Sequence, residues 1–278
     1  MKKSTFYTAC ISLVAFGLLF AKPGIAQTLT IDPADIAAVW LFDDGSGDIL
    51  TDSGGQATDG TIEGATWTTG ARGGGLRFDG VDDIIRIPDS DLINITNGPW
   101  TDRTITAIFK VDDASIADRK QVVFEEGGRT RGIVIYVHDG KVYVGAWNRA
   151  EYNWDGAWPS MPIQSDVWYH VGLVIRDAGN AVEPDKFEMW FNGEKVASEP
   201  GGQMFNHGDD IGIGGTSTNV VFHDDDGTGT DRDWFAGVID EIRIFNASPS
   251  AAELTTFVVS VDPRGKLTTM WGEIKSSR

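Results

Sequence analysis

Two explicit β-hairpins constrain the fold more than any other feature of this sequence. The run IVIYVHDGKVYVGAW places Asp139-Gly140 between two alternating apolar runs, and FEMWFNGEKV does the same with Asn192-Gly193. Both dipeptides tolerate the positive φ angles that a type I′ turn requires. Such turns join neighbouring antiparallel strands, so the sequence predicts an antiparallel sheet around each of them.

Short β-rich runs separated by turn clusters continue along most of the chain, and helical periodicity is nearly absent. We therefore expect an all-β fold, a two-sheet antiparallel β-sandwich or jelly roll. One short helix is expected in SAAELTTF, where Ser248 or Ser250 would cap the first turn and Glu253 follows Ser250 by three positions. The expected strands span residues 37–42, 75–78, 84–87, 104–111, 121–125, 132–138, 141–147, 167–176, 186–191, 211–214 and 235–245.

The beginning of the chain reads as a secretory signal. Lys2 and Lys3 precede the apolar run ACISLVAFGLLFA, and Gly24-Ile25-Ala26 has the small-x-small pattern of a cleavage site. This divides the chain into a signal peptide (1–26), a domain (27–257) and a C-terminal tail of unknown role (258–278). The predicted location is extracellular or periplasmic. Cys10 is the only cysteine, so the mature chain would have no disulfide.

The net charge of the chain indicates which classes of binding partner are unfavourable. The chain carries 41 acidic and 23 basic residues, a formal net charge of −18. A surface this acidic disfavours nucleic acid and anionic membranes. No apolar run after the signal is long enough to span a bilayer, so no membrane insertion of the mature chain is expected.

Several blocks, in order, resemble a known family. The block FDDGSG (42–47), the block FDGVDD (78–83), the strand VWYHVGLVIRD, the hairpin MWFNGEKV and the ending WFAGVIDEIRIFNASPSAAEL resemble laminin-G-like jelly-roll domains of the concanavalin A-like lectin/glucanase superfamily. The resemblance covers about residues 36–257 and implies a concanavalin A-like jelly roll. It also implies a binding or accessory module of a secreted protein, without fixing the ligand.

The segment LFDDGSGDILTDSGGQATDGTIEG, residues 41–64, crowds carboxylates and glycines together. Asp/Gly-rich loops supply the oxygen ligands that Ca²⁺ prefers. The first and last strands pair in the resembled family, which would bring Asp43 close to Asp240. We therefore predict a structural Ca²⁺ that involves Asp43 or Asp240. The alternative is turn chemistry, which is favoured for Asp52, Asp59, Asp79 and Asp82.

An aromatic segment, GAWNRAEYNWDGAWPSMP (145–162), reads as a long loop. Sugar rings stack on aromatic faces while their hydroxyls bind polar side chains, which suggests a carbohydrate site. The candidate ligand-binding residues are Trp147, Tyr152, Trp154, Asp155 and Trp158. The alternative is a loop whose tryptophans form a small core of their own. Trp40, Trp168 and Trp190 lie in predicted strands and are assigned to the core.

No catalytic motif is evident. The glucanase pattern E-x-D-x-x-E is absent, and Asp240 and Glu241 are adjacent, which in a regular strand places them on opposite faces. The four histidines are scattered along the chain, which argues against zinc. The acidic loop 223–234 is either solvated or a weak cation site.

These features favour a secreted, non-catalytic module that binds carbohydrate or a glycosylated surface, with a structural calcium. An adhesion or structural module that binds protein is the main alternative. A glycan-active hydrolase or lyase with an atypical site is a third.

Overall fold

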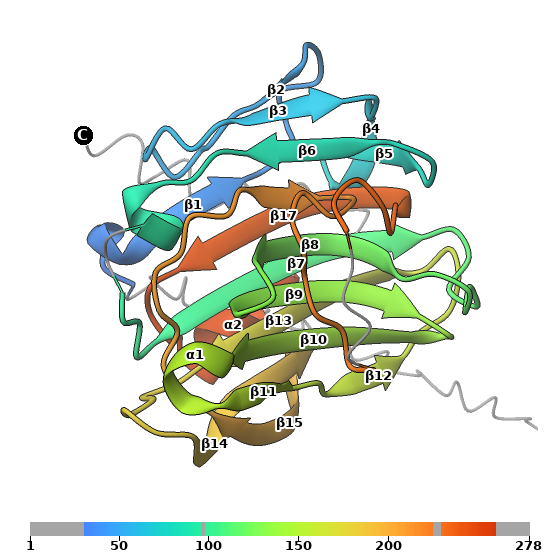
Figure 1. Ribbon diagram of the computed structural model, residues 1–278. Helices are drawn as coiled ribbons and strands as arrows, with labels where there is room; N and C mark the ends of the chain where they lie inside the picture. Colours follow the sequence, from blue (N-terminus) through green and yellow to red (C-terminus); the bar gives the residue numbers. More distant parts are fainter. Residues whose placement is uncertain (1–30, 96–97, 225–228, 260–278) are drawn as a thin grey trace, which may run out of the picture.

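The structure, a computed structural model, describes residues 31–95, 98–224 and 229–259. The predicted signal peptide, Cys10 and residues 260–278 of the predicted tail lie outside the described residues. The described chain forms two antiparallel sheets packed face to face (Figure 1). This confirms the predicted all-β sandwich. None of the described helices is long and apolar enough to cross a membrane.

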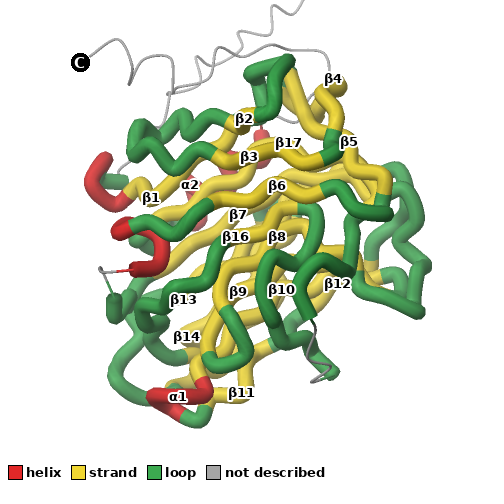
Figure 2. The backbone as a smooth tube through the Cα atoms, turned by 45° about the horizontal axis from the view of Figure 1, so that its top comes forward, coloured by secondary structure: helices red, strands yellow, loops and turns green. Residues whose placement is uncertain are grey.

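Sheet A has the order β15-β14-β13-β7-β17-β5-β4, and β1 also pairs with β17. Sheet B has the order β11-β10-β9-β8-β16-β6-β3-β2, and β12 also pairs with β10. Figure 2 follows the backbone through both sheets. Sheet A consists of β1 (Ile36–Trp40), β4 (Thr66–Arg72), β5 (Gly74–Asp79), β7 (Arg103–Val111), β13 (Trp168–Ile175), β14 (Glu183–Phe191), β15 (Glu194–Gly201) and β17 (Ala236–Phe245). Sheet B consists of β2 (Ile49–Leu50), β3 (Gly60–Glu63), β6 (Ile84–Ile87), β8 (Gln121–Gly127), β9 (Arg131–His138), β10 (Lys141–Asn148), β11 (Trp154–Ala157), β12 (Ser160–Pro162) and β16 (Ile211–Ile213).

Both predicted hairpins form. Asp139 and Gly140 have φ angles of 46° and 73°, and Asn192 and Gly193 have 49° and 85°. The first turn joins β9 to β10, and the second joins β14 to β15. The paired positive φ angles are those of a type I′ turn, which confirms the interpretation of both dipeptides.

The first and last strands pair as the family resemblance predicted. Ala38 lies opposite Ile244, and Trp40 lies opposite Ile242. The β17–β7 register shifts between Asp240 and Arg243, and Glu241 has a φ of 48°. This bulge breaks the regular alternation of the strand. It explains why the assignment of Asp240 and Glu241 to separate faces was wrong: both contact Arg72.

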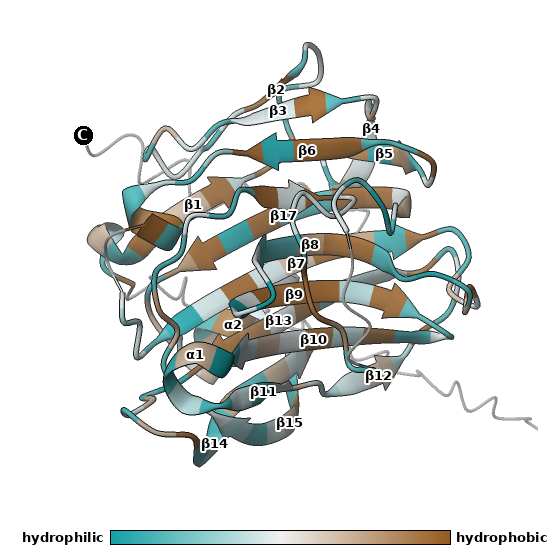
Figure 3. Ribbon diagram, in the orientation of Figure 1, coloured by the Kyte–Doolittle hydropathy of each residue, from teal (hydrophilic) through white to brown (hydrophobic). Residues whose placement is uncertain are grey.

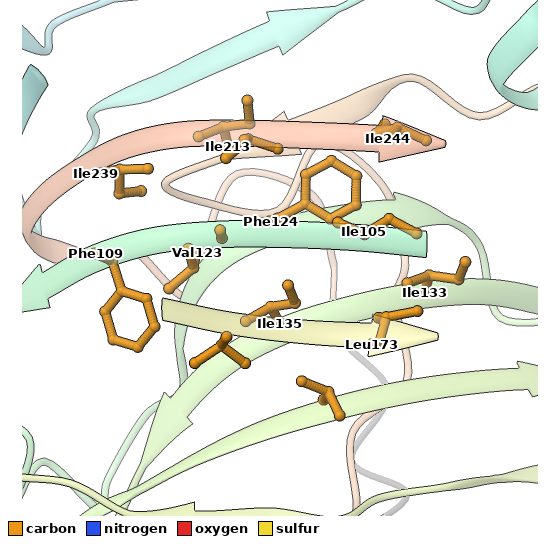
Figure 4. Packing of buried hydrophobic residues seen from close by; sticks show 14 of the residues in the cluster. Ile105, Phe109, Val123, Phe124, Ile133, Ile135, Leu173, Ile213, Ile239 and Ile244 are labelled. Atoms are coloured by element: carbon orange, nitrogen blue, oxygen red, sulfur yellow. The ribbon is translucent and has the colours of Figure 1, made fainter. Parts of the chain in front are cut away.

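The core lies between the two sheets. In Figure 4, Ile105, Phe109 and Leu173 of sheet A lie against Val123 and Ile135 of sheet B. Hydrophobic residues concentrate in the strands, whereas the turns are mostly hydrophilic (Figure 3). Trp40 and Trp190 are buried, as predicted for core residues. Trp168 is only partly buried, with the Lys110 ammonium 5.5 Å from its ring centroid, so its assignment to the core was too strong.

The predicted terminal helix is α2 (Ala251–Val259). Ser250 Oγ accepts the Glu253 N–H at 3.3 Å, and Glu253 Oε2 accepts the Ser250 N–H at 2.9 Å. This reciprocal pair is a capping box and confirms the assignment to Ser250. Three further short helices among the described residues were not predicted: a 3₁₀ turn at Pro33–Asp35, a π-helical turn at Asp91–Ile95, and α1 (Arg149–Tyr152).

Candidate functional site

The aromatic segment is not the long loop that its sequence suggested. It continues β10 to Asn148, turns through α1 (Arg149–Tyr152), and then forms β11 and β12. Asn148 caps α1 by accepting the Glu151 N–H at 3.3 Å, and Asn153 ends it with a φ of 49°. Both β11 and β12 pair with β10, so the segment folds back on the edge of sheet B.

This folding buries two of the five predicted sugar-binding residues. Trp147 is 0% exposed and Trp154 is 5% exposed, and Trp154 packs edge-on against the core residue Phe187. Tyr152 and Trp158 are partly buried, and Asp155 is exposed beside Arg149 at 3.3 Å. Trp147 and Trp154 therefore present no free face to a sugar, and the structure does not gather the five residues into one open surface.

A polar cavity of about 540 Å³ lies nearby, at the turn between β8 and β9. Its walls come from the β8–β9 turn and from three later segments of the chain. The lining residues are Gly128, Arg129, Thr130, Arg131, His207, Asp209, Thr218, Asn219 and Thr230. Arg129 and Asn219 are exposed, and Asp209 is partly buried. The cavity thus offers charged, amide and hydroxyl groups at a depth that a small polar ligand can reach.

The aromatic segment holds the wall of this cavity in place. Trp147 Nε1 donates to the Gly128 carbonyl at 2.9 Å. Arg131 pairs with Glu151 at 2.6 Å, and its other nitrogen donates to the Asn206 carbonyl. Trp147 and Glu151 therefore position the turn rather than line the cavity.

An ion-paired group includes the cavity residue His207. Glu126 is buried between Arg103 at 3.5 Å and His207 at 3.0 Å. Burial by itself would lower the pKa of His207, but the hydrogen bond and the charge of Glu126 outweigh it and raise that pKa. His207, which lines the cavity, therefore holds its positive charge to a higher pH than an ordinary histidine does.

Another buried carboxylate anchors the far wall. Glu125 Oε1 accepts the Ser217 N–H at 2.7 Å, and Thr218 Oγ1 lies 3.3 Å from Oε2. Burial raises the pKa of Glu125 to about 8, although the hydrogen bonds from Ser217 and Thr218 oppose the shift. These contacts fix the start of a segment that crosses the outer face of sheet B, the covering segment (residues 216–224).

The covering segment brings two distant histidines together. Val220, Val221 and Phe222 pack on the outer side chains of β8, β9 and β10, in a cluster separate from the main core. Beyond them, His223 stacks on Tyr143 at 4.4 Å between ring centroids. One ligand atom each from His138, His223 and Asp224 lie within 4.8 Å of one another. His138 and His223, which are far apart in the sequence, therefore lie together in the fold, and no spacing in the sequence signals this.

The predicted calcium residues each accept a backbone N–H at the turn between β4 and β5. Asp43 Oδ1 accepts the Gly74 N–H at 2.7 Å, and Asp240 Oδ2 accepts the Arg72 N–H at 2.9 Å. Asp43 is exposed, whereas Asp240 is buried. Burial, followed by the charge of Glu241, raises the pKa of Asp240 to about 8.

Turn chemistry accounts for most of the other aspartates in the N-terminal block. Asp52 accepts the N–H groups of Val39 and Gly54 at 2.9 Å and 2.8 Å. Asp59 accepts the Asp52 N–H at 2.7 Å, and Asp79 accepts the Val81 N–H at 2.8 Å. The bonds to residues two positions on confirm the turn interpretation for Asp52 and Asp79, whereas Asp59 bridges across the loop. Asp79, Asp82 and Asp83 also lie close enough to share a cation.

The outer face of sheet A carries a buried charged cluster. Glu241 pairs with Arg72 and, at 2.8 Å, with Arg243. His170 lies on the same face, because its neighbours Tyr169 and Val171 point into the core. Burial, then the charges of Arg243 and Arg72, lower the pKa of His170 to about 3. This cluster was also not predicted.

Comparison with known proteins identifies the fold. A family model described as the concanavalin A-like lectin/glucanases superfamily matches residues 79–255, more than half of the chain. A comparison with curated protein sequences found no match.

Similar solved structures include domain 4 of AbnA, a GH43 extracellular arabinanase from Geobacillus stearothermophilus, in complex with arabinotriose. It has a TM-score of 0.57 and 16% identity, over 81% of this chain and 98% of that domain. The botulinum neurotoxin serotype D binding domain has a TM-score of 0.62 and 11% identity, over 86% of this chain and 54% of that one. The binding domain of Paraclostridial Mosquitocidal Protein 1 has a TM-score of 0.60 and 14% identity, over 86% and 55%. The chain spans about half the length of the toxin domains, and at these identities the likeness shows the fold alone.

Proposed function

The chain belongs to the concanavalin A-like lectin/glucanase superfamily, and we propose that it is a secreted, non-catalytic module that binds carbohydrate. The main support for this proposal is the polar cavity at the β8–β9 turn, whose lining includes Arg129, Asp209 and Asn219. The arabinotriose complex of the similar arabinanase domain is a precedent for sugar binding on this fold.

The cavity suits one or two sugar rings. Its volume of about 540 Å³ lies within the usual range for small-molecule sites, about 300–1,000 Å³. Sugar hydroxyls both donate and accept hydrogen bonds, and Asp209, Asn219 and Arg129 supply both kinds of partner. Because the cavity is open and polar, we expect weak binding of a single glycan, about micromolar to millimolar, strengthened when several copies engage one surface.

A glycan panel tests this function. The untagged protein is compared with the double variant Asp209→Asn, Asn219→Ala, which alters the cavity without touching the core. We expect the double variant to bind the best glycan at least about tenfold more weakly, or about 1.4 kcal/mol. Asp155→Asn is the matched control, because Asp155 is exposed and lies outside the cavity lining.

The outcomes separate the alternatives. Equal binding by the parent and the double variant would contradict the cavity as the site. If Trp158→Ala alone removed binding, the site would be the partly exposed aromatic surface instead. A folded parent that binds no glycan on the panel would favour the adhesion module, which binds protein.

We also propose a structural Ca²⁺ at Asp43. Asp43 Oδ1 is held by the Gly74 N–H, and Oδ2 has no hydrogen bond to the residues that the structure describes. Asp240 lies across the same turn, but the nearby Arg72 and Arg243 oppose a cation there, so Asp43 is the stronger ligand candidate. Saturating Ca²⁺ should raise the Tm by several degrees.

A melting experiment in millimolar Ca²⁺ and in chelator checks this proposal. Asp43→Asn should remove most of the shift, and Asp240→Asn less of it. His138→Gln should leave the shift unchanged, because Ca²⁺ prefers oxygen ligands. An identical Tm with and without Ca²⁺ would exclude a structural role for the ion.

A further inference from the structure

The histidine pair on the outer face of sheet B forms a second, separate site. His138 is the last residue of β9, and His223 and Asp224 follow the apolar part of the covering segment. One ligand atom from each of these three residues falls within 4.8 Å of the other two. Both histidines are partly buried and Asp224 is exposed, so the site opens to solvent on one side.

Both imidazole rings are oriented in the way that metal-binding histidines usually are. His138 Nδ1 lies 3.3 Å from the Arg119 carbonyl oxygen, which can only accept a hydrogen bond, so Nδ1 carries the proton. His223 Nδ1 lies 2.7 Å from Tyr136 Oη. With both Nδ1 atoms engaged, Nε2 is the ring nitrogen that has no hydrogen-bond partner among the residues that the structure describes. Metal-binding histidines typically give their second ring nitrogen to such an oxygen partner.

The site is also held in place before any ion arrives. Tyr136 Oη accepts the His223 backbone N–H at 3.1 Å as well as facing its ring. The His223 ring is nearly parallel to Tyr143, with 16° between the planes. Phe222 packs on Tyr136 at 4.7 Å between ring centroids. The covering segment is therefore anchored immediately before the ligands.

The donor set selects the kind of ion. Two imidazoles and one carboxylate suit zinc and neighbouring transition metals, whereas calcium takes only oxygen ligands. Ligand atoms of a tetrahedral zinc ion lie about 3.3 Å apart. The three side chains would therefore close slightly around the ion, and water would complete its coordination.

Lys120 limits the affinity of the site. Its ammonium lies 2.6 Å from Asp224 and about 5.3 Å from the centroid of the Phe222 ring. A bound cation shares Asp224 with this ammonium and is repelled by it. Removal of the charge in Lys120→Met should therefore strengthen metal binding.

We propose that His138, His223 and Asp224 bind a divalent transition metal ion of the zinc class, which fastens the covering segment to sheet B. The same segment carries Thr218 and Asn219, two lining residues of the polar cavity. Metal binding thus stabilises one wall of that cavity from a distance, without touching the cavity itself.

The test uses the untagged protein, freed of metal by chelation, with Zn²⁺ measured by calorimetry and Co²⁺ by its visible absorption. We expect one ion per chain and at least a tenfold loss of affinity in His138→Gln, in His223→Gln and in Asp224→Asn. Asp224 is exposed, so its variant keeps the fold even if a histidine variant does not. Asp139→Asn is the control, because this exposed carboxylate is next to His138 in sequence but outside the cluster.

The proposal is independent of sugar binding, because metal affinity is measured without glycan. It would be overturned if the parent bound Zn²⁺ no more tightly than Asp224→Asn and the histidine variants. An equal loss in Asp139→Asn would also overturn it, since that result would indicate general attraction of cations to an acidic surface.

Discussion

The outer faces of the two sheets place histidines in opposite surroundings. On sheet A, His170 is buried beside Arg72 and Arg243, and neither of its ring nitrogens has a hydrogen-bond partner among the described residues. On sheet B, His138 and His223 lie next to a carboxylate, and each has an oxygen partner for Nδ1. The three side chains are chemically identical, so any difference between them comes from their surroundings. The same residue type is thus surrounded by two arginines on one face and placed beside a carboxylate on the other.

The largest expected loss of stability comes from removing a charge in the buried cluster of sheet A. Glu241 is the shared partner of the buried Arg72 and Arg243. Glu241→Gln leaves two buried positive charges facing a neutral group, which should lower the free energy of unfolding by about 3–5 kcal/mol. Chemical denaturation measures this loss.

The control for that experiment is an ion pair on the surface. Glu63 and Arg86 lie 3.2 Å apart, and the Glu63 side chain is 49% exposed. Glu63→Gln should cost less than about 1 kcal/mol. Similar losses in the two variants would show that the sheet A cluster is solvated and that its burial is not what distinguishes it.

Features that depend on residues close together in the sequence were predicted better than features that depend on contacts between distant residues. The Asp139-Gly140 and Asn192-Gly193 turns and the Ser250 capping box are local, and each was predicted correctly. Medium-range folding was missed: the return of β11 and β12 onto β10 buries Trp154, because a strand edge needs a partner and a short polar-aromatic run supplied one. The bulge at Glu241 was also missed, since it depends on the pairing with β7.

The site residues were hardest to predict because they meet only through the fold. His138 and His223 are brought together by the covering segment, and Arg129 and Asp209 by the packing of distant turns. The polar cavity has no continuous motif. Glu125 is buried in a strand and contacts Ser217 and Thr218, which are distant in the sequence. The sequence alone does not distinguish such a buried carboxylate from an exposed one.

The pH dependence of stability compares the two faces directly. The pKa of Asp240 on sheet A and that of Glu125 on sheet B are both raised to about 8 by burial. Between the ordinary pKa of each carboxyl group and about pH 8, the folded chain keeps the proton whereas the unfolded chain has lost it. The free energy of unfolding therefore falls as the pH rises through that range. Each group contributes up to about 1.4 kcal/mol per pH unit.

Unfolding measured at pH 6.5, 7.25 and 8 should therefore show a steep decline. Asp240→Asn and Glu125→Gln should each flatten it by about half. His170 has the opposite pH dependence. Its pKa in the folded chain is lowered to about 3, so its contribution to the free energy of unfolding is present above about pH 6.5 and is lost as the pH falls. A pH profile that is the same in all these variants would mean that the buried carboxylates titrate normally.

A smaller effect is expected at Tyr136, which supports the histidine pair. Tyr136→Phe removes the hydroxyl that faces His223 Nδ1 and accepts its backbone N–H, which should cost about 1–3 kcal/mol. Zinc affinity should fall by about 10–100-fold, as when the hydrogen-bond partner of a metal-binding histidine is removed.

Tyr152→Phe is the matched variant, because Tyr152 donates to Gln203 and lies outside the histidine cluster. It should leave zinc affinity unchanged. If both tyrosine variants lost affinity equally, the effect would come from a general loosening of sheet B rather than from the orientation of His223.

A crystal structure of the protein with the oligosaccharide that binds it best would locate the sugar site directly. We expect the sugar to lie in the cavity at the β8–β9 turn, within hydrogen-bond distance of Asp209 and Asn219. Sugar bound instead over Trp158, with the cavity holding only solvent, would contradict this expectation.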